Sequence, residues 1–126
     1  MNSAALARTA YRQSAVIAPS ERTVEYRAFA QITGQLATAE QDESHEGFLK
    51  LCHAVQQNRR LWGILAADAA ANGNGLPDAL RGQIVSLADF TWKHSVKVLR
   101  KEADAQPLID INTAIMRGLR GAEDEG

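Results

Sequence analysis

The chain has 126 residues, of which 45% are hydrophobic and 23% are charged, a balance typical of one globular domain rather than a disordered chain. Its formal net charge of −1 argues against a dedicated nucleic-acid binder, because such domains are usually strongly basic. The single cysteine excludes an intramolecular disulfide, no apolar run approaches the roughly 18–20 residues of a membrane span, and no secretory signal pattern is present, so we expect a cytoplasmic protein.

Helical periodicity dominates the chain from residue 20 onward. Residues 1–18 show at most a short helix, around residues 4–14, and we assign no function to them. Ser20 is a suitable N-cap, and an apolar stripe follows it to about Ala39. The stripe recurs at every fourth position and consists of Val24, Ala28, Ile32 and Leu36, with Phe29 beside it.

A second helix is expected from about His45 to Ala71, after an acidic linker at residues 40–43 and with Ser44 as its N-cap. The apolar residues on one of its sides are Phe48, Leu51, Cys52, Val55, Trp62, Leu65 and Ala69. The run Asn72–Gly75 should end this helix, because asparagine and glycine tolerate the left-handed conformation found at helix C-termini.

Two prolines mark the remaining helices. Pro77 suits the first position of a third helix that runs to about Ala103, and Pro107 begins a fourth. The apolar residues of the third are Leu80, Ile84, Leu87, Trp92, Val96 and Leu99, and those of the fourth are Leu108, Ile111, Ile115 and Leu119. Residues 121–126 form an acidic tail that should fray. Connections of about five residues favour antiparallel neighbours, so the sequence predicts a single all-α domain over residues 1–126, a small antiparallel bundle of about four main helices.

Arginine and tryptophan side chains near the second and third helices are candidates for a partner-binding surface, because these residue types dominate interface energetics. The candidates are Arg59, Arg60, Trp62, Arg81 and Trp92. Two structural interpretations stay open. The arginines would be solvated with stems that cover apolar surface, and both tryptophans would pack in the core between the second and third helices. Asn58 bonded to a loop backbone would make the whole motif structural.

A basic stripe is predicted near the end of the third helix, with His94 alongside. Its members, at spacings i, i+4, i+7 and i+8, are Lys93, Lys97, Arg100 and Lys101. Cations at this position stabilise a helix C-terminus. Attraction to an acidic protein surface or to RNA is the alternative, although the lack of interleaved aromatic residues and the net charge near zero argue against RNA.

No pattern in the sequence indicates catalysis, a cofactor or a metal. Cys52 and His53 are adjacent on a predicted helix and therefore point about 100° apart, which prevents them from sharing one ligand sphere or acting as a nucleophile and its base. No second cysteine or i+4 histidine completes a metal-binding set. We therefore expect an interaction protein rather than an enzyme.

Four short motifs follow one another in the second half of the chain. They are Asn58-Arg59-Arg60-Leu61-Trp62, Leu76-Pro77-x-x-Leu80-Arg81, Leu108-Ile109-x-Ile111-Asn112-x-x-Ile115 and Gly118-Leu119. In this order they resemble the FlaF family of alphaproteobacterial flagellar biosynthesis regulators, over about residues 20–120. The resemblance implies a protein that promotes flagellin synthesis and export, acts with the regulator FlbT and binds flagellin as a chaperone. The alternatives are control of flagellin mRNA together with FlbT, and a structural partnership with FlbT that involves no contact with flagellin.

Overall fold

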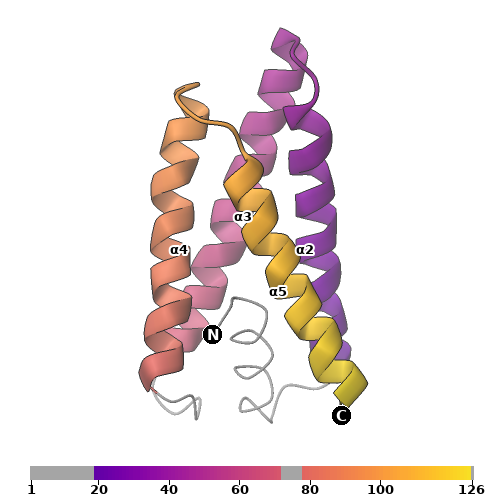
Figure 1. Cartoon of the computed structure of the whole chain (residues 1–126), viewed down its shortest axis with the longest axis vertical. Helices are drawn as coiled ribbons and strands as arrows, with labels where there is room; N and C mark the ends of the chain where they lie inside the picture. Colours follow the sequence, from indigo (N-terminus) through magenta and orange to yellow (C-terminus); the bar gives the residue numbers. More distant parts are fainter. Residues whose placement is uncertain (1–18, 72–77, 126) are drawn as a thin grey trace.

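The computed structural model describes residues 19–71 and 78–125, which form four helices and contain no strand. The helices are α2 (Pro19–Glu40), α3 (His45–Ala70), α4 (Asp78–Leu99) and α5 (Gln106–Glu125). Consecutive helices run in opposite directions and form an antiparallel bundle (Figure 1). The predicted all-α bundle is confirmed, whereas the short helix expected at residues 4–14 lies outside the described residues.

The start of α3 is set by a compact turn. Ser44 has extended dihedral angles, and its Oγ accepts a hydrogen bond from the N–H of Gly47 at 3.0 Å, as expected of an N-cap. The Ser44 hydroxyl and N–H donate to the Oδ1 atom of Asp42 at 2.6 and 3.0 Å. A Cβ atom on Gly47 would collide with the backbone oxygen and side chain of Asp42. Glycine at position 47 is therefore what allows the turn to pack this closely.

The end of α4 differs from the prediction, because the helix stops at Leu99 rather than continuing to Ala103. Lys101 adopts the left-handed conformation with φ of 61°. Two backbone hydrogen bonds close the helix, from Lys101 N–H to the Val98 carbonyl at 3.0 Å and from Glu102 N–H to the Lys97 carbonyl at 2.8 Å. This pattern is a Schellman motif, which usually has glycine at the left-handed position. A lysine there conceals the end of the helix in the sequence.

The other helix ends lie close to the expected positions. Helix α3 ends at Ala70, with Ala71 as its extended C-cap, and the predicted terminators at residues 72–75 lie outside the described residues. Helix α5 begins at Gln106, one position before the predicted start, and the carboxylate of Asp104 accepts a hydrogen bond from the Gln106 N–H at 3.0 Å. Its bounds include residues 121–125, which the sequence placed in a frayed tail.

The core of the described bundle contains two larger apolar clusters and a smaller one formed by Ala69 and Ile84. The first, nearer the α2–α3 turn, has as its buried members Leu36, Ala39, Leu51, Ala54, Val55, Val98, Ala105 and Leu108. The second is built from Phe29, Trp62, Ala88 and Ile115. Within it the rings of Phe29 and Trp62 meet edge to face, with centroids 5.9 Å apart and planes at 77°, a favourable aromatic geometry.

A layer of buried polar residues separates these two clusters. On each helix, at least one polar residue lies in sequence between a member of the first cluster and a member of the second. The members of this polar layer are Thr33, Asn58, Thr91, Ser95 and Asn112. The predicted apolar stripe of α2 is therefore only partly correct, since Thr33 is buried more deeply than Ile32.

Helix α5 packs mainly against α2 and touches α4, its neighbour in sequence, only a little. Figure 1 shows α4 and α5 diverging from the end at which they are connected. At that end the Nε2 atom of His94 on α4 forms a hydrogen bond with the carbonyl oxygen of Asp104 at 2.7 Å, which holds the connection against the bundle. Among the described helices, α4 thus packs chiefly on α3 and makes little contact with α5.

Candidate partner-binding surface

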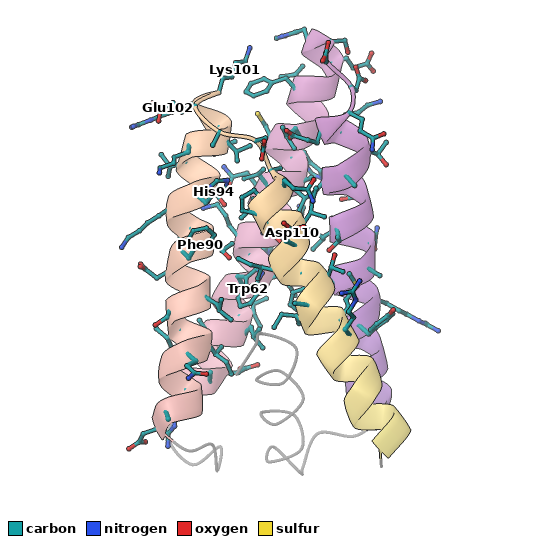
Figure 2. All side chains as sticks on the ribbon, in the orientation of Figure 1. Trp62, Phe90, His94, Lys101, Glu102 and Asp110 are labelled. Carbon is teal, nitrogen blue, oxygen red and sulfur yellow. The ribbon has the colours of Figure 1, made fainter. Side chains whose placement is uncertain are left out.

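Trp62, one of the five candidate residues, lies in the core. Its side chain is completely buried inside the bundle (Figure 2), and its Nε1 donates a hydrogen bond to Oδ1 of Asn112 at 2.9 Å. The Nδ2 of Asn112 in turn donates to Oδ1 of Asn58 at 2.7 Å. Trp62 therefore does not belong to the outer surface. Asn112 is thus a buried polar residue that bonds across the bundle and can fix the register of the helices. Asn58 bonds the side chain of Asn112 rather than a loop backbone.

Helix α4 has an unusual distribution of side chains. The residues that it buries are mostly small or polar: Ile84, Ala88, Thr91, Ser95 and Val98. Three of its large apolar side chains remain exposed, Val85 by 41%, Phe90 by 44% and Trp92 by 46%. The expectation that Trp92 packs in the core is therefore wrong. The physical reason is that the polar layer and the close contact with α3 favour small side chains at the buried positions of α4.

Trp92 is covered on one side by Arg59. The guanidinium carbon of Arg59, on α3, lies 3.8 Å from the centroid of the Trp92 ring, within the range of a cation–π contact. Arg81 and Val85 fall on the same face of α4 as Trp92, because positions 81, 85 and 92 repeat at helical spacing. Arg81 is partly exposed and pairs with Asp78 at 3.5 Å. We call Arg59, Arg81, Val85 and Trp92 the α3–α4 surface.

Arg60 does not join this surface. It is exposed, and as the residue next to Arg59 it lies about 100° further around α3. The structure therefore brings two of the five candidates, Arg59 and Trp92, into contact. Arg81 lies on the same face of α4 about three turns from Trp92, whereas Arg60 points elsewhere and Trp62 is internal.

The predicted basic stripe is not continuous. Because α4 ends at Leu99, Arg100 and Lys101 lie beyond the helix, and only Lys97 is a basic residue of the last turn. Lys93 pairs with Asp89 on the same helix at 2.8 Å. The Nζ of Lys101 lies 4.4 Å from the centroid of the Phe48 ring at the start of α3, at the end of the bundle seen uppermost in Figure 2. Lys93 and Lys101 thus make different local contacts, and Arg100 and Lys101 do not continue the helical spacing that the sequence predicted.

A groove between α2 and α3 was not predicted. Its volume is about 840 Å³, its walls are mostly apolar, and it is lined by residues that include Ala30, Gly34, Thr38, Leu49, Lys50 and His53. Leu49 is 55% exposed there, and Lys50 pairs with Glu46 at 3.8 Å on the rim. The signal in the sequence was the i+4 spacing of Ala30, Gly34 and Thr38, three small residues on one side of α2.

In the part of the chain that the structure describes, no group of three or more His, Cys, Asp or Glu side chains could hold a metal ion. Cys52 is half-buried and His53 exposed. The pKa of Asp42 lies below its ordinary value of 3.8. The main cause is the hydrogen bond that its carboxylate accepts from the Ser44 hydroxyl, and the bond from the Ser44 N–H adds to it. Within the described ranges, no helix combines the length and apolar character that crossing a membrane requires.

Comparison with known protein families shows to which family the chain belongs. The family model described as flagellar protein FlaF matches residues 7–119. The chain belongs to the FlaF family. Searches of curated proteins and of solved structures give no match. The resemblance to FlaF seen in the sequence is thus confirmed, and with it the assignment of the chain as a flagellar protein.

The FlaF-like motifs divide between the inside and the outside of the bundle. Asn58, Trp62 and Asn112 form the buried hydrogen-bonded chain and hold α3 to α5. Arg59 is partly exposed beside α4, and Arg81, from the second motif, is partly exposed on α4 itself. In this FlaF protein the first motif therefore combines buried structural residues with residues that are partly exposed.

Proposed function

We propose that this FlaF-family protein is a non-enzymatic regulator of flagellin synthesis and flagellum assembly, and that it binds flagellin in the cytoplasm as an export chaperone. Membership of a flagellar family supports the biological setting. The exposed Trp92 next to Arg59 supports the mode of action, because tryptophan and arginine are enriched at the centres of protein interfaces. This exposed pair is the observation on which the proposal mainly rests.

An amphipathic helix is the partner that suits the α3–α4 surface. Val85 and Trp92 lie on one face of α4, seven residues or about 10.5 Å apart along the helix axis. A partner helix can place apolar side chains two turns apart against such a pair, in the i, i+3, i+4 and i+7 pattern of helix recognition. The terminal segments of a flagellin monomer, unfolded before assembly and apolar once helical, have this character.

Binding of this kind should be reversible. A segment that folds as it binds uses about 2–5 kcal/mol of the interaction free energy to become ordered, which lowers its net affinity. A chaperone must release flagellin to the export apparatus, so moderate affinity suits the role.

Calorimetric titration of the protein with monomeric flagellin tests the proposal. Trp92→Ala should weaken binding by about tenfold or more, the loss typical of a central aromatic anchor. Leu49→Ala is the control, since Leu49 is also a large apolar side chain, is comparably exposed and lies in the α2–α3 groove instead. Absence of flagellin binding by the unaltered protein would refute the chaperone role. Binding to FlbT alone, retained in Trp92→Ala, would favour a structural partnership with FlbT.

A further inference from the structure

We propose that Arg59 and Trp92 together bind a carboxylate side chain of the partner helix. The inference rests on the proposed function and specifies the chemistry of the segment that is bound. It starts from the position of the Arg59 guanidinium, which lies over the indole with its central carbon 3.8 Å from the ring centroid. Trp92 stays 46% exposed beside it, so a docked helix reaches both groups.

The positive charge of Arg59 is not neutralised within the described bundle. No carboxylate of the described residues forms an ion pair with it, and its Nε has no hydrogen-bond partner. Three cations on these helices, Lys50, Arg81 and Lys93, each pair with an acidic residue one turn away, and Arg59 does not. The buried Nε is out of reach of a partner, so a carboxylate would bind at the outer edge of the guanidinium, through the Nη groups.

The stacking prepares Arg59 for this role. A guanidinium presents its N–H groups in a planar fork that matches the two oxygens of a carboxylate, and stacking on an aromatic ring limits the orientations of the fork. Val85 lies on the same face of α4 as Trp92 and accepts the apolar side of the partner helix. The segment recognised should therefore carry an aspartate or glutamate at the edge of its apolar stripe, about one turn from an apolar residue that contacts Trp92.

Titration with monomeric flagellin at low and high salt tests the proposal. Arg59→Gln should weaken binding about tenfold and reduce the salt dependence. Arg59→Lys should recover only part of the affinity, because lysine keeps the charge and lacks the planar fork. Arg60→Gln removes the same charge from the neighbouring exposed position and should bind like the unaltered protein. Thermal melting of each variant shows whether the bundle stays folded.

A double-mutant cycle identifies the carboxylate. Acidic residues in the terminal segments of flagellin are changed one at a time to the corresponding amides. One change should weaken binding to the unaltered protein by about tenfold and have little further effect on Arg59→Gln. Flagellin that binds the unaltered protein and folded Arg59→Gln equally well overturns the carboxylate site alone, whereas no binding at all overturns the proposed function with it. Dimerisation through this surface, or binding of flagellin leader RNA that depends on Arg59, also overturns it.

Discussion

Asn112 provides a direct test of how the polar layer stabilises the bundle. Its side chain is completely buried and forms two hydrogen bonds, accepting from Trp62 at 2.9 Å and donating to Asn58 at 2.7 Å. In Asn112→Ala the indole N–H of Trp62 and the Oδ1 of Asn58 each lose their hydrogen bond to Asn112, in a part of the core that water does not reach. Each orphaned buried group costs about 1–3 kcal/mol, and the space left by the side chain adds to the loss. We expect the free energy of unfolding to fall by about 3–5 kcal/mol.

Urea denaturation followed by far-ultraviolet circular dichroism measures this loss. Asn58→Ala should cost less than Asn112→Ala, because the Nδ2 of Asn58 already has no partner and its removal breaks a single bond. The double variant should cost less than the sum of the two, since the bond between the two amides is then lost only once. Thr113→Ala is a control on the same helix, where the hydroxyl bonds only the carbonyl of Ile109 one turn earlier. Equal losses in Asn112→Ala and Thr113→Ala would refute the reasoning.

Three further predictions concern the helix ends. Gly47→Ala should lower the free energy of unfolding by about 1–3 kcal/mol through its collision with Asp42, and an unchanged urea midpoint would contradict this. Lys101→Gly should be about 1 kcal/mol more stable than Lys101→Ala, because only glycine adopts φ of 61° without strain; the reverse order of melting temperatures would argue against the Schellman end. Ser44→Ala should cost about 1 kcal/mol near neutral pH through the lost N-cap bond to Gly47. The hydrogen bonds from Ser44 also lower the pKa of Asp42, and this stabilises the fold at pH values above 3.8, the ordinary pKa of the group. The stabilisation is lost as the pH falls through the folded-state pKa. In an acid titration, the difference in the free energy of unfolding between Ser44→Ala and the unaltered protein should therefore shrink below pH 3.8.

Much of the secondary structure could be predicted from local chemistry. Ser44 and Pro107 have preferences that act within one turn of a helix, and they place the starts of α3 and α5 to within a residue. The end of α4 could not be predicted in this way. It depends on Lys101 in a conformation that lysine rarely adopts, held by backbone hydrogen bonds and by contact with Phe48 on another helix.

The two tryptophans show what tertiary structure alone decided. Trp62 and Trp92 both occupy apolar positions of a helical repeat, and nothing local to either residue separates core from surface. Trp62 is buried because Asn112, fifty positions later in the chain, accepts the hydrogen bond of its indole N–H. Trp92 is exposed because α4 packs chiefly on α3 through small residues such as Ala88 and Ser95, and α5 lies against α2 instead. The periodicity of the sequence thus determined that these segments are helices. Only the packing of the helices against one another decided which tryptophan is buried and which remains exposed.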